Sequence, residues 1–220
     1  MAQRMGGREL PLRHNETRKV SILSRIVNRI ILFFYRWKGW TIEGSLPKNL
    51  KKYVIAGAPH TSNWDFVFFV GATKKEQIQP NFMGKHTLFK GAMRNFMLDM
   101  GGIGVDRSKA GGTIDQMKAE FAQRAELALV IAAEGTRKSD GKWKSGFYRI
   151  AEAAQVPIVP AFVDNERMII GFAPPMMPSG NYGEDLLKIA KWLRSKLPDY
   201  ERFKVLEQQA RDIVAGKNDL

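Results

Sequence analysis

The sequence contains no cysteine. This absence excludes disulfide bonds, thiolate metal ligands and a cysteine nucleophile, and it fits a reducing compartment. Histidine is also scarce, with three residues at positions 14, 60 and 86. Neither their spacing nor any cluster of carboxylates in the sequence matches a metal site, so we expect no metal and no bound cofactor.

Long apolar runs are missing as well. A membrane-spanning helix needs about 20 consecutive apolar residues, and the nearest candidate, residues 20–40, is interrupted by Arg25, Asn28, Arg29 and Arg36. We therefore predict no transmembrane helix. A secretory signal is not expected either, because a long polar stretch precedes this run and no clear small-residue cleavage site follows it.

Acidic residues are too few to balance the basic ones. The chain has 35 Lys and Arg against 22 Asp and Glu, which gives a formal net charge of +13. This excess favours an anionic partner, whether nucleic acid, a phospholipid surface, an acidic carrier protein or a phosphorylated substrate. Because no zinc finger or RNP-type aromatic motif is recognisable, nucleic acid is not the expected partner.

The length of 220 residues suits one sizeable domain, and no break in composition argues for two. Residues 1–17 are polar and basic, and we expect them to be disordered. Residues 18–40 form a distinct amphipathic segment, and residues 41–220 are expected to form the domain itself.

The amphipathic segment is organised as a helix with two faces. At about 3.6 residues per turn, Arg18, Arg25, Arg29 and Arg36 fall within about 40° of one another. The opposite side carries Val20, Leu23, Val27, Ile30, Ile31 and Phe34. A basic face, an apolar face and the aromatic residues at its end suit a helix that lies in a membrane interface. The alternative is a helix packed on the protein's own core, with its arginines in water.

Short apolar runs alternate with helical patterns along the rest of the chain. The runs expected to form strands are residues 41–52 (a strand and a turn), 53–58, 81–83, 102–105, 127–133, 156–162 and 166–172. Helices are expected in the segment that contains Phe66 and Val70 and over residues 113–126 and 145–154. One or two further helices are expected near the end of the chain. This alternation predicts an α/β fold, a single domain with a largely parallel central sheet flanked by helices.

Three polar motifs each follow a predicted strand directly. They contain His60, Arg107 and the stretch Glu134–Arg137. In open α/β sheets, functional sites form beyond the carboxyl ends of the parallel strands. The sequence therefore predicts that a base, a carboxylate and two arginines meet on one rim of the sheet.

His60 and Asp65 are candidates for a catalytic pair. If His60 lies on the turn before a helix and Asp65 in its first turn, the carboxylate can orient the imidazole and stabilise its protonated form. The alternative is a helix N-terminus with Ser62 as N-cap and Asp65 as its capping-box partner, which leaves His60 as a solvated loop residue.

The other two motifs are suited to a phosphate group. Arg107 and Arg137 can each contact a phosphate through two hydrogen bonds. Gly135 allows the backbone to approach a ligand closely, Thr136 offers a hydroxyl, and Lys85 adds positive potential. The alternatives are a solvated charged loop for Arg137 and a surface ion pair with Asp106 for Arg107.

No protein nucleophile accompanies the histidine. The sequence has neither a Gly-x-Ser-x-Gly elbow nor a Walker-type loop. We infer that His60 activates the hydroxyl of a substrate.

Four blocks, in order, resemble those of a known family. They are His60-x4-Asp65, Gly104–Ser108, Glu134–Arg137 and Val156–Pro160, and together they span about half the chain. In this respect the sequence is similar to the glycerolipid acyltransferases of the lysophosphatidic acid acyltransferase (1-acyl-sn-glycerol-3-phosphate acyltransferase) type.

The resemblance implies acyl transfer from an acyl-CoA or acyl-carrier-protein thioester to the hydroxyl of a lysophospholipid, giving phosphatidic acid. By this analogy His60 is the general base and Asp65 orients it. Arg107 and the block of Glu134, Gly135, Thr136 and Arg137 bind the acceptor's glycerol phosphate, with Lys85 nearby. Val156, Pro157 and Pro160 are structural or line the acyl-donor site.

The resemblance also implies a location and leaves alternatives open. Residues 41–220 are then the acyltransferase domain of a peripheral, monotopic protein on the cytoplasmic face of a membrane, held by an anionic surface. Two positions depart from the family pattern, namely Pro59 before the histidine and Ala132-Ala133 before Glu134. A lyso-aminolipid acceptor remains an alternative, as does a non-catalytic protein that binds anionic lipid.

Overall fold

The computed structural model of the protein describes residues 20–59, 69–73, 75–106, 108 and 112–217. Residues 1–17, expected to be disordered, lie outside this set. Within it, seven strands form one sheet in the order β1-β7-β6-β2-β5-β3-β4. The strands are β1 (Thr41–Glu43), β2 (Lys52–Ala58), β3 (Pro80–Lys85), β4 (Gly102–Val105), β5 (Leu127–Ala132), β6 (Ile158–Asp164) and β7 (Ile169–Phe172).

Neighbouring strands of this sheet are parallel except for β6 and β7, which are antiparallel. The α/β fold with a largely parallel sheet, predicted from the sequence, is therefore confirmed. Strand β2 lies at the centre and pairs with β5 on one side and β6 on the other. It is buried along most of its length, as expected for a parallel strand covered on both faces.

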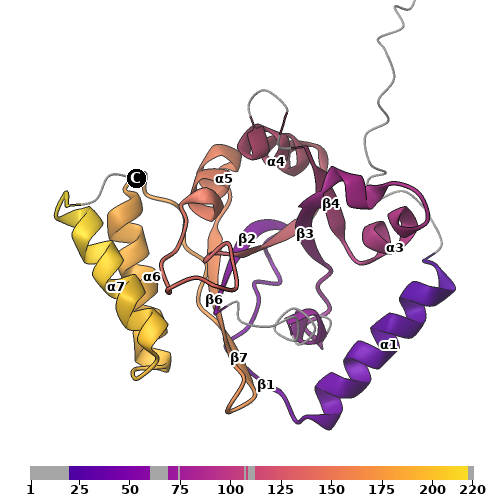
Figure 1. Ribbon diagram of the computed structural model, residues 1–220, viewed down its shortest axis with the longest axis horizontal. Coiled ribbons are helices and arrows are strands. Elements are labelled where there is room, and N and C mark those ends of the chain that lie inside the picture. Colours follow the sequence, from indigo (N-terminus) through magenta and orange to yellow (C-terminus); the bar gives the residue numbers. More distant parts are fainter. Residues whose placement is uncertain (1–19, 60–68, 74, 107, 109–111, 218–220) are drawn as a thin grey trace, which may run out of the picture.

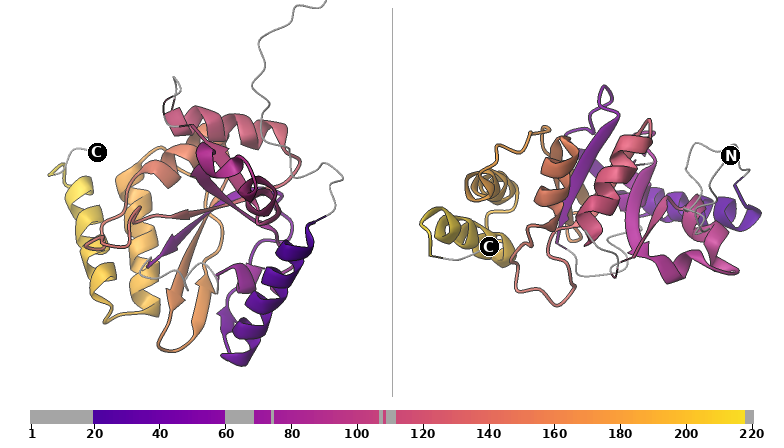
Figure 2. Two further views of the ribbon diagram at one scale, coloured as in Figure 1. Left: turned by 45° about the vertical axis from the view of Figure 1, so that its right-hand side comes forward. Right: turned by 90° about the horizontal axis from the view of Figure 1, so that it is seen from above.

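Helices cover both faces of the sheet (Figure 1). They are α1 (Ile22–Trp37), α3 (Met93–Asp99), α4 (Gly112–Gln123), α5 (Gly146–Ala154), α6 (Tyr182–Lys196) and α7 (Glu201–Val214), with a short 3-10 helix η1 (His86–Phe89). Residues 69–73 are also helical. Figures 1 and 2 show α6 and α7 side by side at one end of the sheet, and α1 near α3 at the other.

The alternation of side chains along β2 divides the core into two layers. Val54, Ala56 and Ala58 point to the side covered by α4, α5, α6 and α7. Tyr53 and Ile55 point to the other side, where they pack with Tyr35 of α1 and with Phe69. The sheet is thus the middle layer between two sets of helices.

Helix α3 is absent from the sequence-based expectations. It has only seven residues and no side chain that caps its N-terminus. About two turns are too few for a 3.6-residue period to stand out from a loop. Its position is fixed instead by tertiary contacts, since Leu98 is buried and Asp99 bonds to α1.

Helix α1 is attached to the rest of the protein along one face. Ser24, Ile31 and Tyr35 are buried. The Asp99 carboxylate accepts hydrogen bonds from the Ser21 N–H at 3.1 Å and from the Ser24 hydroxyl at 2.8 Å. Among the described residues, no helix is long and apolar enough to cross a membrane.

The other faces of α1 are in contact with solvent. An apolar strip consists of Ile22, Leu23, Ile26, Ile30, Phe33 and Trp37, whose side chains are 48–70% exposed. Arg25, Arg29 and Arg36 are exposed beside it. Ile31, expected on the same apolar face as Leu23 and Ile30, turns inward, because the helix packs through the face that contains Ser24 and Tyr35. The helix therefore has a buried face, an apolar exposed face and a basic exposed face.

A buried carboxylate joins α6 to α5. Asp185 accepts hydrogen bonds from the Ser179 N–H at 2.7 Å, the Tyr148 hydroxyl at 3.0 Å and the Lys188 ammonium at 3.0 Å. Burial alone would raise the pKa of Asp185, but these hydrogen bonds outweigh it and hold the pKa below its ordinary value of 3.8. The carboxylate is therefore stabilised in its charged form.

We predict that Asp185→Asn lowers the free energy of unfolding at pH 7 by about 1–3 kcal/mol. Because the folded pKa of Asp185 is lowered, its contribution is fully present above the unfolded pKa. It is lost as the pH falls through the folded pKa. The difference between wild type and variant should therefore shrink below about pH 4, as measured by urea denaturation from pH 7 to pH 3.

Asp140→Asn is the control, because the Asp140 side chain is 65% exposed and lies 3.9 Å from Lys142. It should change stability little at any pH. A difference for Asp185→Asn that is the same at pH 3 and pH 7 would contradict the expectation.

Candidate functional site

The carboxyl ends of four parallel strands meet at one edge of the sheet. Strand β2 pairs with β5, β5 with β3, and β3 with β4, all in parallel. They end at Ala58, Ala132, Lys85 and Val105. The segments that follow, which carry the sequence motifs, therefore leave the sheet at the same edge, as predicted.

Three predicted site residues, His60, Asp65 and Arg107, lie outside the described residues. The residues that flank them are placed. Pro59 follows β2 through a cis peptide bond, and Asp106 follows β4. The contact between His60 and Asp65 stays a prediction.

A cavity of about 740 Å³ opens at this edge. Its walls are largely apolar and come from β2, β3, β5, β6, α4 and α5. They include Ala58, Phe82, Met83, Ile131, Ala161 and Val163. Gly135, Thr136 and Lys144 add polar groups at one side. The size is that of a small-molecule pocket, and the combination of apolar walls with a polar side suits an amphiphilic ligand.

The polar side of the cavity belongs to one loop, residues 134–144, which follows β5. The loop is closed at its base, since the Lys144 N–H donates to the Ala133 carbonyl at 2.9 Å. Gly135 has a φ of +74°, and a Cβ placed on it would lie 3.0 Å from Cδ of Lys144. Glycine thus provides both the left-handed backbone and the space for Lys144 to lie across the loop.

Glu134 points away from the cavity and into the protein. Its side chain is fully buried, and Arg202 of α7 donates a hydrogen bond from Nη1 to its Oε2 at 2.5 Å. The carboxylate is not among the described residues that line the cavity. The geometry gives Glu134 a role in holding the loop, whereas Gly135 and Thr136 are the members of the block that line the cavity.

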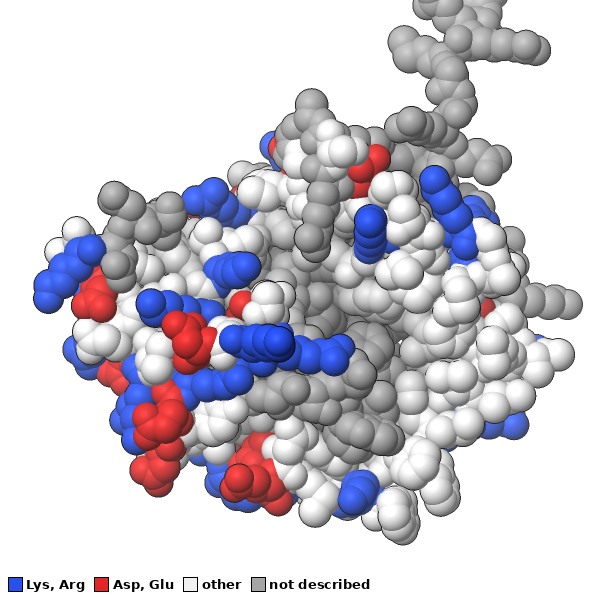
Figure 3. Space-filling view, in the orientation of Figure 1, with Lys and Arg blue, Asp and Glu red and all other residues white. Residues whose placement is uncertain are grey.

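Arg137 and Lys85 are both exposed at this edge of the sheet. Arg137 follows Thr136 on the loop, and Lys85 ends β3. Neither is among the residues assigned to the cavity wall. In Figure 3, several Lys and Arg side chains lie around the middle of the face viewed. Their positive potential favours an anionic ligand at the mouth of the cavity.

The segment before Arg107 is held by α4. The Gln116 side chain accepts from the Asp106 N–H at 2.9 Å and donates to the Asp106 carbonyl at 2.6 Å. The Asp106 carboxylate accepts from the Ser108 N–H and hydroxyl, and its Oδ1 lies 3.9 Å from Nδ1 of His86. These contacts fix the backbone on both sides of position 107.

Val156 and Pro157 directly precede β6, and Pro160 lies within it. Val156 and Pro160 are buried, and Pro157 is partly buried. The Pro157 carbonyl accepts from the Val54 N–H at 2.9 Å, and the Pro160 carbonyl accepts from the Ala173 N–H at 2.9 Å. They are not among the described cavity-lining residues, whereas Ala161 and Val163 further along the strand are. The placement favours the structural role for this block.

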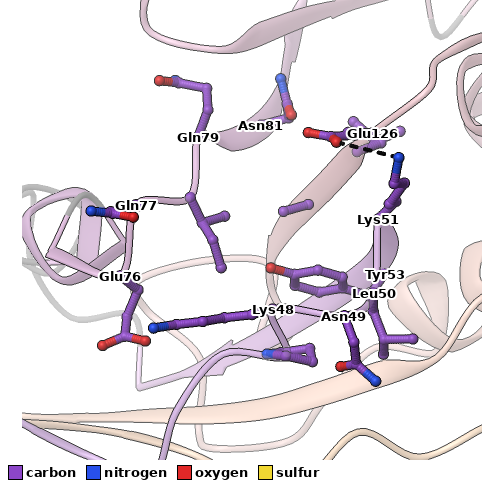
Figure 4. A pocket seen from close by; sticks show the side chains of 14 residues that line it. Lys48, Asn49, Leu50, Lys51, Tyr53, Glu76, Gln77, Gln79, Asn81 and Glu126 are labelled. Carbon is purple, nitrogen blue, oxygen red and sulfur yellow. Dashed lines mark ion pairs between the residues drawn. The ribbon is translucent and has the colours of Figure 1, made fainter.

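A second cavity, of about 390 Å³, lies at the opposite edge, near the amino ends of β2, β5 and β3. Figure 4 shows its lining, in which Lys51 lies 3.9 Å from Glu126. None of the four sequence blocks contributes to it. The candidate site is therefore the cavity at the carboxyl edge.

Several residues that shape this site are not evident from sequence reasoning. Gln116 is 10 residues from Asp106, and Arg202 is 68 residues from Glu134, so neither pair forms a local pattern. Lys144 lies outside all four sequence blocks. Within the described part of the chain, no group of three or more His, Cys, Asp or Glu side chains is arranged to hold a metal ion.

Comparisons with known proteins find similar sequences among curated proteins. The chain is 26% identical over 156 residues to the 1-acyl-sn-glycerol-3-phosphate acyltransferase of Streptococcus pneumoniae, a match covering 62% of this chain and 58% of that protein. It is 32% identical over 145 residues to the probable 1-acyl-sn-glycerol-3-phosphate acyltransferase of Mycoplasma pneumoniae, covering 61% and 53%. The chain thus spans a little over half the length of these curated relatives.

A solved structure shares the fold. The crystal structure of the 1-acyl-sn-glycerophosphate (LPA) acyltransferase PlsC from Thermotoga maritima matches with a TM-score of 0.52 and 20% identity. The match covers 92% of this chain and 86% of that one. The acyltransferase family model matches residues 41–164, which contain all four sequence blocks. The chain belongs to the acyltransferase family.

Proposed function

We propose that the protein transfers a fatty acyl group from a thioester to the hydroxyl of a lysophospholipid, with 1-acyl-glycerol-3-phosphate as acceptor and phosphatidic acid as product. Membership of the family and the similarity to the acyltransferases of Streptococcus pneumoniae and Mycoplasma pneumoniae support this reaction. The observation that carries the proposal is the large apolar cavity that ends at Gly135 and Thr136, at the sheet edge where the His60 segment begins.

The mechanism uses a base and no covalent acyl-enzyme. His60 removes the proton from the acceptor hydroxyl as its oxygen attacks the thioester carbonyl, and Asp65 orients the imidazole and stabilises its charged form. The tetrahedral intermediate collapses with loss of the thiolate, which takes up the proton from His60. The absence of cysteine from the chain and of a serine elbow motif supports direct attack by the acceptor.

The acceptor's phosphate is bound by the loop at the polar side of the cavity. Thr136 and Lys144 line that side, and Arg137 follows in the same loop. Arg107, which follows β4 in the sequence, supplies a second arginine. Lys85 is exposed at the end of β3. It adds to the positive electrostatic potential near the cavity rather than making a fixed contact with the phosphate.

The acyl donor is an acyl-CoA or an acyl carrier protein, both of which present the same thioester carbonyl. The protein acts on the cytoplasmic face of a membrane as a peripheral protein. Helix α1 supports this attachment, because its exposed apolar strip lies beside its exposed arginines, an arrangement typical of helices in an anionic interface. No cofactor takes part in the reaction as proposed.

We expect purified protein to form phosphatidic acid from labelled oleoyl-CoA and lysophosphatidic acid in mixed micelles. His60→Ala should lower turnover by roughly 10²–10⁴-fold or more, because it removes the general base. His14→Ala is the control and should keep wild-type activity. Circular dichroism melting of each variant shows whether the fold is intact, and a folded His60→Ala protein with wild-type turnover would refute the mechanism.

If the wild type forms no phosphatidic acid in this assay, other acceptors and donors should be tested. Product from a lyso-aminolipid acceptor or from an acyl-carrier-protein donor would support the same acyl transfer with a different substrate. Sedimentation with anionic vesicles, without product from any pair, would favour a lipid-binding protein that lacks catalysis.

Lys144→Met should raise the KM for lysophosphatidic acid roughly 5- to 50-fold, since it removes a cation from the polar side of the cavity. The KM for oleoyl-CoA should change much less. The matched control is Lys142→Met, because Lys142 is exposed, lies near Asp140 and is not assigned to the cavity wall. Equal effects of the two substitutions on the acceptor KM would reject a phosphate contact by Lys144.

Membrane attachment is best tested by a point substitution in α1. Deleting residues 1–40 also removes the buried Ile31, Tyr35 and Trp40, so weaker binding would have two explanations. Phe33→Glu changes a side chain that is 63% exposed and should lower the fraction that sediments with anionic vesicles by roughly 5-fold or more.

Val214→Glu, on α7, introduces the same charge at an apolar side chain that is 45% exposed. It should leave vesicle binding close to that of the wild type. If both variants sediment alike, α1 does not carry the attachment.

A further inference from the structure

The loop that lines the polar side of the cavity is attached to helix α7 at three points. The segment matched by the family model ends at residue 164, so α7 belongs to a part of the chain in which no functional motif is recognised. The contacts nevertheless reach residues 134–144, the loop proposed to bind the acceptor's phosphate.

The first contact is the buried ion pair between Glu134 and Arg202. The carboxylate is fully buried, and the guanidinium is 24% exposed. An unpaired buried carboxylate would destabilise the fold, so the position of Arg202 determines the position of Glu134. Arg202 lies in the first turn of α7, so the start of the loop is fixed relative to that helix.

The second contact pairs the Gln209 side chain with the backbone of Trp143. The Trp143 N–H donates to Oε1 of Gln209 at 2.8 Å, and Nε2 of Gln209 donates to the Trp143 carbonyl at 2.9 Å. These two bonds, one accepted and one donated by the Gln209 amide, fix both the position and the orientation of the Trp143 backbone. The Trp143 side chain is buried in the same core cluster as Phe203 and Leu206 of α7.

The third contact is steric. A Cβ placed on Gly141 would lie 2.8 Å from the Cα and the carbonyl oxygen of Arg202, and the φ of Gly141 is +108°. The middle of the loop therefore lies directly against the backbone of α7, at a distance that only glycine permits.

The two polar contacts lie next to the residues that line the cavity. Glu134 precedes Gly135 and Thr136, and Trp143 precedes Lys144. We propose that α7 is a positioning element for the anion site, in which Arg202 and Gln209 hold the two ends of the loop so that Thr136 and Lys144 face the acceptor's phosphate. This inference rests on the proposed function of the loop. Arg202 and Gln209 act through the loop and do not touch the ligand.

The test compares two neighbouring glutamines of α7. Gln209→Ala removes the pair of hydrogen bonds to Trp143, while Gln208→Ala removes a hydrogen bond to Asp212 on the same helix and none to the loop. Gln209→Ala should raise the KM for lysophosphatidic acid roughly 3- to 30-fold. It should leave kcat and the KM for oleoyl-CoA near the wild-type values, and Gln208→Ala should change none of them.

Hydrogen exchange of the amides of residues 134–144 gives a second readout that needs no activity. Exchange should be faster in Gln209→Ala than in Gln208→Ala. Arg202→Lys, which keeps the charge but not the forked geometry, should show a smaller increase. Arg202→Ala is avoided because the buried Glu134 would then destabilise the whole fold.

The outcomes separate the inference from the function on which it rests. An unchanged acceptor KM in Gln209→Ala, or a donor KM raised to the same extent, overturns the positioning role. If the wild type acylates no lysophospholipid, the proposed function fails instead. Hydrogen exchange then still tests whether Gln209 holds the loop against α7. Equal exchange rates in the two glutamine variants would overturn this attachment, and faster rates in Gln209→Ala would support it.

Discussion

The parallel alignment of β2, β5, β3 and β4 is the constraint on which the rest of the site depends. Each strand ends at the same edge of the sheet, so segments far apart in the sequence are brought together without any contact between their side chains being required. The buried apolar residues of these strands supply the stability. The segments that follow are then free to carry polar and glycine residues suited to a ligand.

The Glu134–Arg137 block illustrates how one short motif serves two environments. Glu134 is buried and bonded to Arg202, whereas the next two residues line a cavity. The left-handed backbone at Gly135 makes this reversal of direction within a few residues possible. A contiguous motif therefore does not imply a contiguous surface, and in this chain the block combines a buried carboxylate with residues that line the cavity.

Local sequence patterns predicted the fold class and the edge of the sheet at which the site lies. Runs such as residues 53–58 and 127–133 have the length and composition of buried parallel strands, so these two properties were sufficient to predict them. Helix α3 was missed because two turns carry too little pattern. Arg202, Gln209 and Gln116 could not be found, because each acts on a backbone or side chain that only the tertiary fold brings near. The pairing of His60 with Asp65 remains a prediction from the sequence.

The hydrogen bonds from Ser21 and Ser24 to Asp99 fix the rotation of α1 about its axis and its position along that axis. Turning the helix by one residue, about 100°, would put Arg25 in the place of Ser24 and leave the Asp99 carboxylate without its two serine donors. Sliding it along its axis would separate the same atoms. Apolar contacts alone tolerate such shifts, but directional hydrogen bonds do not. One backbone N–H, one serine hydroxyl and one carboxylate thus select a single orientation for α1, and with it decide which strip of the helix faces outward.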